Sequence, residues 1–260
     1  TPLYNKIGEG YNHSRKADSY LSKIISDWLP NKKEAVLDIG CGSGNYSLSL
    51  KNKGFNVFGV DPSDTMLSLT REQSKEIIWT KGSAENIPFD NETFSGIFGT
   101  LTLHHWKNYT SAFKELYRVA KPGAKLIFFT ATPEQMEGYW LNHYFPKMLE
   151  ASIIQMPSLQ VLTEAASNVG FLFHSEEPYF VTNDLEDYFL YAGKHRPEIY
   201  FDENIRKGIS SFSALANKTE VKKGLETLKE DLDTGKFEAI KKQFGNKTGD
   251  YTFIRWAKAG

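Results

Sequence analysis

A glycine-rich segment near residue 40 has the residue types and the spacing to bind a nucleoside-bearing ligand. Gly40, Gly42 and Gly44 follow an apolar run, and glycines let the backbone turn sharply and let a ligand approach without meeting a Cβ atom. Asp61 closes the next apolar run, 23 residues after Asp38. A carboxylate there can accept hydrogen bonds from both ribose hydroxyls of an adenosine. The pattern therefore predicts an adenosine-containing cofactor.

The glycine loop also bears on which cofactor this is. Nicotinamide dinucleotides and S-adenosylmethionine both carry adenosine, but the dinucleotide fingerprint G-x-G-x-x-G sets a helix N-terminus against a pyrophosphate. The third glycine here comes one residue too early, at Gly44, so no pyrophosphate need be bound. Taken alone, the loop also fits a purely structural role as a tight turn between a strand and a helix.

The elements around the loop alternate between strand and helix. Apolar runs predict strands at 35–39, 55–60, 77–80, 94–99, 125–130, within 172–181 and at 250–257, and amphipathic spacing predicts helices at 13–29, from 44, from 63, at 108–120 and near 160–168. Lys121-Pro122-Gly123 is expected to form a turn before the fifth strand. This alternation predicts an α/β fold: a Rossmann-like, doubly wound, mostly parallel seven-stranded sheet.

The chain length favours one large domain with an appended part. We expect an N-terminal helical cap at 1–30, a Rossmann-like core at 31–182 and a last core strand within 246–260. The segment 183–245 reads mainly as helices and is expected to be an inserted helical lid. Aromatic residues at 140–145, 188–191 and 198–201 either line an acceptor pocket under this lid or pack in the core.

Composition and charge exclude several classes of protein. Hydrophobic residues make up 40% and charged residues 24%, the balance of a soluble globular protein. With 31 basic and 32 acidic residues, no overall field draws the chain onto nucleic acid or anionic lipid. One cysteine excludes an intramolecular disulfide, and no apolar run is long enough to cross a bilayer. We expect a cytoplasmic protein with no signal peptide, membrane contact or nucleic-acid partner.

Four blocks between Val36 and Phe129 resemble the class I S-adenosylmethionine-dependent methyltransferases, in the broad subgroup that includes the ubiquinone and menaquinone biosynthesis methyltransferases. Besides the glycine loop and Asp61, the blocks are residues 82–89 and 113–123. Matches in the right order and spacing are more specific than any one block. The resemblance implies S-adenosyl-L-methionine as the cofactor and S-adenosyl-L-homocysteine as the product.

The resemblance also implies which residues surround the cofactor. Asp38, Gly40 and Gly42 would lie around its methionine moiety, and Asp61 would hold the ribose. Other expected contacts are Met66 near the adenosine, Ser83, Ala84 and Glu85 around the adenine, and Thr100. Position 83 is often Asp in such enzymes, so the Ser here leaves more of the adenine contact to backbone groups. Phe94-Ser95 also replaces the common Phe-Asp, with no expected effect on the site.

The N-terminal Tyr4, Tyr11 and Arg15 resemble a segment that folds over the cofactor in this family. Arg15 can pair with the methionine carboxylate, and the tyrosines can close the pocket. The alternative is that both tyrosines are half-buried helix residues and Arg15 is a solvated charge.

His104 and His105 follow the fourth predicted strand, where ligands of open α/β sheets bind. Imidazole titrates near neutrality, so either residue could be the base where an acceptor carries a proton. Packing or acceptor binding is the alternative. No carboxylate or thiol cluster at ligand spacing accompanies these histidines, so we expect no metal site.

Together these observations predict methyl transfer from S-adenosylmethionine to a small-molecule acceptor by in-line displacement. One alternative is a methyltransferase acting on tRNA bases, for which residues 204–207 and 222–223 are the candidate basic clusters. A non-catalytic S-adenosylmethionine-binding module is another, and other reactions on this fold stay open. The sequence does not identify the acceptor or the oligomeric state.

Overall fold

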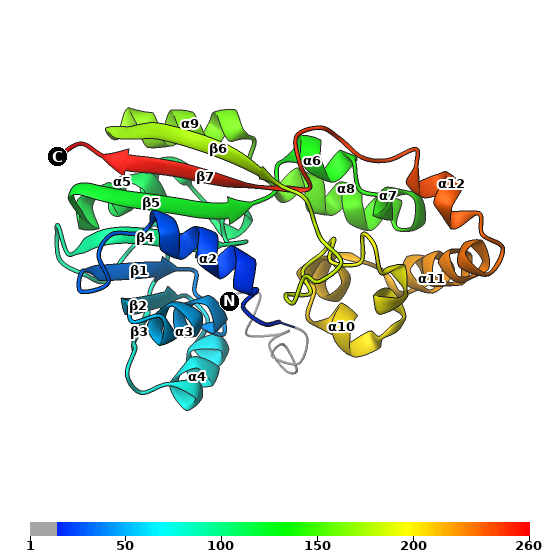
Figure 1. The fold of residues 1–260 in the computed structure, drawn as a ribbon, viewed down its shortest axis with the longest axis horizontal. Helices are drawn as coiled ribbons and strands as arrows, with labels where there is room; N and C mark the ends of the chain where they lie inside the picture. The colour runs from blue at the N-terminus through cyan, green and yellow to red at the C-terminus, as the bar shows by residue number, and fades with distance from the viewer. Residues whose placement is uncertain (1–14) are drawn as a thin grey trace.

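The computed structural model describes residues 15–260 and contains one seven-stranded sheet flanked by helices (Figure 1). The strands are β1 (Ala35–Ile39), β2 (Asn56–Asp61), β3 (Ile78–Lys81), β4 (Phe94–Thr100), β5 (Ala120–Thr130), β6 (Phe171–Tyr179) and β7 (Tyr251–Lys258). They are ordered β3-β2-β1-β4-β5-β7-β6, and β7 alone runs antiparallel to its neighbours. The predicted doubly wound, mostly parallel fold is confirmed.

Helices cover both faces of this sheet. They are α2 (Ser19–Trp28), α3 (Asn45–Asn52), α4 (Asp64–Gln73), the 3₁₀ turn η2 (Leu103–His105), α5 (Tyr109–Val119) and α9 (Leu159–Asn168). Strand residues alternate between the two faces: Val36 joins the cluster under α2 and α3, whereas Leu37 joins the cluster under α5 and α9. The central strands β1, β4 and β5 are therefore buried on both sides, as in most parallel sheets, whereas the edge strand β6 is largely exposed.

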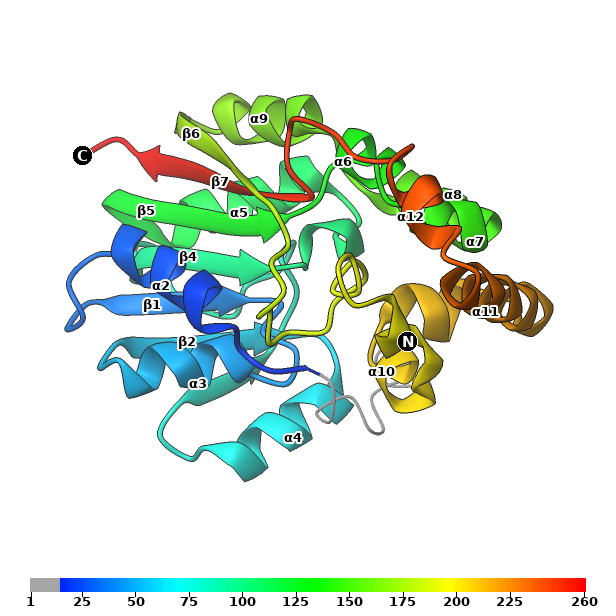
Figure 2. The ribbon, with the colours of Figure 1, turned by 45° about the vertical axis from the view of Figure 1, so that its right-hand side comes forward.

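A second group of helices lies beyond the carboxyl ends of the parallel strands (Figures 1 and 2). It comprises α6 (Pro133–Glu137), α7 (Leu141–Tyr144), α8 (Pro146–Gln155), the 3₁₀ turn η3 (Pro197–Phe201), α10 (Glu203–Lys207), the π-helical turn η4 (Ser211–Leu215), α11 (Lys218–Asp233) and α12 (Phe237–Lys241). We call these elements the helical body. Two separate stretches of chain, 133–155 and 197–241, build it.

The structure differs from the sequence predictions in three segments. Lys121-Pro122-Gly123 lies inside β5, at a shift in the β4–β5 pairing where Gly123 takes a φ of 77°, and not in a turn before the strand. Residues 132–160 contain α6 to α8, for which no helices were predicted. Residues 183–196, predicted to be mainly helical, contain no helix. Backbone N–H groups there donate to carbonyl groups in short turns, for example Lys194 N to Tyr191 O at 3.0 Å, or to side chains, for example Tyr191 N to Tyr251 Oη at 3.1 Å.

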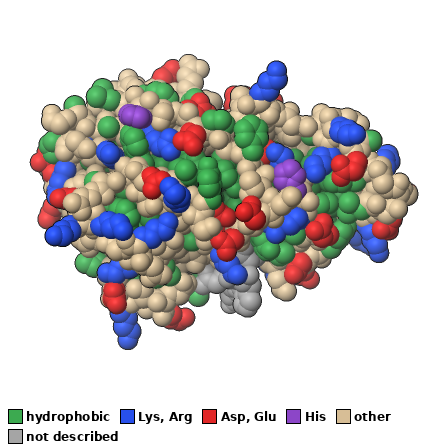
Figure 3. All heavy atoms as spheres, viewed as in Figure 1, with side chains coloured by type: hydrophobic (Ala, Val, Ile, Leu, Met, Phe, Trp, Pro, Cys, Tyr) green, Lys and Arg blue, Asp and Glu red, His purple; other side chains and the backbone are tan. Residues whose placement is uncertain are grey.

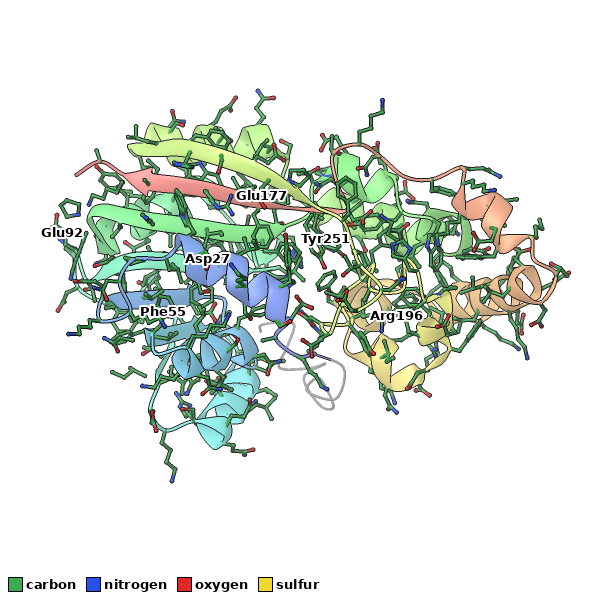
Figure 4. The ribbon with its side chains drawn as sticks, viewed as in Figure 1. Asp27, Phe55, Glu92, Glu177, Arg196 and Tyr251 are labelled. Atoms are coloured by element: carbon green, nitrogen blue, oxygen red, sulfur yellow. The ribbon has the colours of Figure 1, made fainter. Side chains whose placement is uncertain are left out.

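Most of the aromatic residues considered for a lid pack in the core. Trp140, Tyr144, Phe145, Tyr191 and Tyr200 are buried. The ring of Trp140 lies edge-on to Phe237, with centroids 5.1 Å apart. Tyr251 stands where β7 leaves the helical body (Figure 4), and its ring stacks on Phe129 of the sheet. The ring of Tyr139, between α6 and α7, lies 5.9 Å from the ring of Tyr251, so aromatic packing also joins the helical body to the sheet.

Candidate functional site

A cavity of about 580 Å³ lies between the carboxyl edge of the sheet and the helical body. Four loops, which follow β1 to β4, form one wall. The lining residues from these loops are Gly40–Ser43, Asp61–Ser63, Gly82–Glu85, Thr100–Thr102 and His104–Lys107. Carboxyl ends of parallel strands meet at one edge, which is where open α/β sheets bind ligands. No helix within residues 15–260 is both long and apolar enough to span a membrane.

The glycine loop after β1 has a backbone shape that larger residues rarely adopt. Gly40, Gly42 and Gly44 have φ angles of 74°, 53° and 80°. A Cβ atom built on Gly40 would lie 1.9 Å from Thr102 Oγ1 in the loop after β4. A Cβ built on Gly42 would meet no protein atom within 4 Å. Gly40 therefore permits close packing of two loops, and Gly42 leaves open space beside the cavity.

Asp61 ties the first two loops together. Its Oδ2 accepts a hydrogen bond from Gly42 N at 2.9 Å, and its Oδ1 accepts one from Ser63 N at 2.8 Å. Burial raises the pKa of Asp61 to about 6, although both hydrogen bonds act in the opposite direction. Each carboxylate oxygen can accept more than one hydrogen bond, so Asp61 keeps capacity for a ligand hydroxyl.

Asp38 lies behind the cavity wall, and it is not among the lining residues. Its Oδ2 accepts a hydrogen bond from Ser47 Oγ at 2.6 Å, whereas Oδ1 is buried and has no partner. Burial raises the pKa of Asp38 to about 7; the Ser47 bond opposes this rise and the nearby Asp61 adds to it. The resemblance implied that Asp38 lies beside the methionine moiety. In the structure its carboxylate is not among the residues that line the cavity.

The remaining expected cofactor residues line the cavity. Met66 and Ala84 are buried, and Ser83 and Glu85 follow β3. Glu85 Oε1 accepts hydrogen bonds from Lys107 N at 2.6 Å and Asn108 N at 3.3 Å, which joins the loops after β3 and β4. Thr100 lines the cavity at the end of β4. Tyr4 and Tyr11 lie outside the described residues.

His104 and His105 lie in the 3₁₀ turn after β4 and line the cavity with their rings 3.9 Å apart. Burial lowers the pKa of His104 well below its usual value, and nearby His105 and Arg15 lower it further. The protein around His105 desolvates it and lowers its pKa to about 4, although its side chain is accessible to solvent. Both imidazoles are therefore neutral at pH 7 and are weak bases.

Arg15 is paired with a protein carboxylate. Its guanidinium binds both oxygens of Asp187, with Nη2 and Oδ2 3.1 Å apart, and Tyr46 Oη donates to Oδ2 at 3.1 Å. Next to this pair, Glu186 N donates to Asp18 Oδ2 at 3.1 Å. We call these five residues the clasp. Arg15, Tyr46 and Asp187 line the cavity, so the clasp joins the N-terminal segment and residues 186–187 across it.

The helical body supplies the opposite wall. Met136, Met156, Phe189, Ile209 and Leu215 contribute apolar surface. The π-helical turn η4 also lines the cavity, and such turns are frequent at functional sites. Sequence reasoning missed this wall and the clasp because their members lie far apart along the chain. One local signal was available, the Thr132-Pro133 start of α6, where Thr132 and Gln135 form a capping box.

Comparisons with known proteins bear on this arrangement. The model of the methyltransferase-domain family matches residues 37–128, the strands and loops that form the sheet side of the cavity. A demethylmenaquinone methyltransferase of Oceanobacillus iheyensis is 25% identical over 174 residues, covering 64% of this chain and 71% of that protein. An uncharacterised methyltransferase of Mycobacterium tuberculosis is 30% identical over 127 residues, which span about half of each protein (49% and 52%).

A solved structure with a TM-score above 0.8 matches nearly the whole chain. It is a putative methyltransferase from an antibiotic biosynthesis pathway of Anabaena variabilis, with 30% sequence identity and a TM-score of 0.81. The match covers 93% of this chain and 98% of that one. The similarity therefore extends beyond the sheet to the helical body.

The contact between Gly40 and Thr102 gives a first prediction. Gly40→Ala should lower the free energy of unfolding by about 3 kcal/mol, because it adds a steric clash to the cost of a positive φ. Gly123→Ala is the matched control: Gly123 has a similar φ of 77° but open space around it, so about 1–2 kcal/mol is expected. Urea unfolding measures both. Equal losses in the two variants would show that the Thr102 contact does not matter.

The clasp gives a second prediction. Asp187→Asn should lower the free energy of unfolding by about 3 kcal/mol, because it leaves Arg15, whose side chain is 13% exposed, without its carboxylate. Asp27→Asn breaks the exposed ion pair with Lys23 and should cost less than about 0.5 kcal/mol. Thermal and urea unfolding of both variants check this. An Asp187→Asn protein as stable as the control would contradict the structural role of the clasp.

Proposed function

Because the chain belongs to the class I S-adenosylmethionine-dependent methyltransferases, we propose that it transfers the cofactor's methyl group to a small-molecule acceptor bound in the cavity. The observation that carries this proposal is the convergence of the glycine loop and Asp61 on one wall of that cavity. The acceptor would lie against the opposite wall, which the helical body forms.

The residues present fit such a cofactor. Gly42 offers open space beside a bare backbone, where a ligand can approach without meeting a Cβ atom. Asp61 has acceptor capacity left for the two ribose hydroxyls. Asp38 Oδ1 is buried without a hydrogen-bond partner, so a donor that reached it directly or through a water molecule would be favoured. These features support a binding position in which the adenosine of the cofactor lies at Asp61 and its methionine moiety lies near Gly40 and Gly42.

The protein's own part in the reaction is mainly alignment. S-adenosylmethionine, when bound, supplies a methyl group on a positively charged sulfur. The loop after β4 would hold the acceptor in line with that group, and this positioning is a large share of catalysis for a displacement reaction. Leu101 in this loop has a φ of 51°, a strained backbone of the kind found at functional sites.

His104 and His105 would orient the acceptor through neutral imidazoles. Their lowered pKa values leave them uncharged at pH 7, so they can donate or accept a hydrogen bond and are poor proton acceptors. Arg15 would hold the methionine carboxylate while it stays paired with Asp187. We further propose that residues 1–30 and 183–245 act together as a cap and lid over the core.

The described surface supports a small molecule over tRNA. Both basic clusters considered for tRNA are neutralised locally: Lys207 pairs with Glu203 at 3.0 Å, and Lys222 lies 4.0 Å from Glu226. Arg206 donates to the carbonyl of Tyr200. On the face shown in Figure 3, basic and acidic side chains are intermixed. Phosphate binding favours basic groups without acidic neighbours, whereas Lys207 and Lys222 each lie beside a glutamate.

Cofactor binding should depend on pH through Asp61. Ribose hydroxyls stabilise the ionised carboxylate, so bound ligand lowers the pKa from about 6. Affinity for S-adenosylhomocysteine should therefore rise with pH up to about 6 and then level off, with about tenfold weaker binding at pH 5 than at pH 7.5. Isothermal titration across this range measures it. Asp61→Asn should bind weakly at every pH and lose this step.

Asp38, whose pKa is also raised, is the control for that experiment. Asp38→Asn should retain the rise that ends near pH 6, since Asp61 remains. A wild-type pH profile that persists in Asp61→Asn would rule out Asp61 as the ribose ligand.

The acceptor class has a direct test. The protein is incubated with methyl-labelled S-adenosylmethionine and either transfer RNA or a panel of small molecules carrying hydroxyl, amine or thiol groups. We expect label in the organic-soluble small molecules and none in acid-precipitated RNA. Label in RNA alone would contradict the proposal.

A further inference from the structure

The cavity wall opposite the glycine loop, where the acceptor would lie, is mainly apolar. Met156 follows the end of α8, Ile209 precedes η4, and Leu215 ends η4; Phe189 and Leu190 come from the segment that follows the clasp. All five line the cavity, and Phe189 and Ile209 are each 2% exposed. An apolar wall of this kind stabilises a ligand by removing apolar surface from water.

The buried hydroxyl groups in this wall satisfy one another. Ser152 of α8 and Ser211 of η4 are both buried, and their Oγ atoms lie 2.9 Å apart. Ser152 Oγ also lies 2.8 Å from the carbonyl oxygen of Met148. These groups therefore need no ligand to complete their hydrogen bonds. The hydrogen bond between Ser152 and Ser211 joins α8 to η4. Because both hydroxyl groups already have partners, a ligand meets a wall that is mainly apolar.

The charged groups on the cavity wall are concentrated on the sheet side. Asp61, Glu85 and Lys107 come from the loops after β2, β3 and β4, and Asp187 is paired with Arg15. In the loop after β4 on the sheet side, His104 lines the cavity with a neutral ring. A charged acceptor placed against the apolar wall would lose its hydration without gaining a partner, which costs several kcal/mol. A neutral acceptor avoids that cost.

We infer that the acceptor is an uncharged organic molecule with a mainly apolar body, seated between α8 and the π-helical turn η4, with a neutral polar group directed toward His104. This inference rests on the proposed function, because it assigns the remaining space of the cavity to the second substrate. It excludes phosphorylated and carboxylated acceptors in favour of neutral phenols, alcohols or amides of similar bulk.

Matched ligands test the charge preference. With S-adenosylhomocysteine saturating, the affinities of 2-naphthol, 2-naphthyl phosphate and 2-(aminomethyl)naphthalene are measured by titration calorimetry or fluorescence. The naphthol should bind at least about tenfold more tightly than either charged ligand. Equal binding, preference for a charged ligand, or failure of the naphthol to bind overturns the inference.

Variants of η4 locate the binding wall. Ala214 lines the cavity and is exposed, so Ala214→Glu should fold and place a carboxylate in the wall. It should lower the ratio of naphthol affinity to ammonium-ligand affinity about tenfold. Ser213→Glu is the matched control, because Ser213 is exposed in the same turn and does not line the cavity. An unchanged ratio in Ala214→Glu, or the same change in both variants, overturns the placement.

The proposed hydrogen bond between His104 and the acceptor can be tested separately, by comparing the affinities of 2-naphthol and naphthalene. Wild-type protein should bind 2-naphthol about threefold to tenfold more tightly than naphthalene, the worth of one hydrogen bond. His104→Phe keeps an aromatic ring and should abolish that difference. A difference that survives in His104→Phe overturns this part of the inference.

Binding of S-adenosylhomocysteine to the same samples distinguishes a failure of the proposed function from a failure of the inference about the acceptor. If it does not bind to folded wild-type protein, the proposed function fails. If it binds normally while the ligand preferences are absent, only the inference about the acceptor fails.

Discussion

The carboxylate of Asp61 is the constraint on which the candidate site depends. It accepts hydrogen bonds from Gly42 N and Ser63 N, so one side chain fixes the loop after β1 against the start of the helix after β2. The same carboxylate is expected to bind the ribose. Because it is buried, it depends on those backbone donors to offset its loss of hydration. In the proposed complex, the same side chain would therefore serve both cofactor recognition and loop geometry.

A second constraint joins the two substrate regions. The clasp links Arg15, on the cofactor side, to Asp187, two residues before Phe189 in the acceptor wall. The helical body is held to the sheet by the contact of Tyr139, between α6 and α7, with Tyr251 at the start of β7.

The sequence predicts the sheet and the cofactor wall well, because both depend on local patterns. Apolar runs ending in Gly40 and Asp61 identify strand ends, and parallel strands bring such ends together. The mostly parallel fold and the methyltransferase family are confirmed. The choice of residues that touch the cofactor stays a prediction; Asp38, which is bonded to Ser47, is not among the residues that line the cavity.

The acceptor wall could not be predicted in the same way. It is assembled from α8, η4 and an irregular segment whose contacts span up to 172 residues of sequence, as in the pair of Arg15 and Asp187. Aromatic residues such as Trp140 and Tyr200 looked equally suited to a pocket or a core, and burial places them in the core. Side-chain type alone does not distinguish these roles, since both require apolar surface.

Titration calorimetry of S-adenosylhomocysteine against the wild-type protein and Asp61→Ala tests the central claim most directly. The account predicts one binding site in the wild type and about 100-fold weaker binding in the variant, the worth of two hydrogen bonds to a charged acceptor shared with the loop. Absence of binding to folded wild-type protein, or equal affinities of the two proteins, would contradict it.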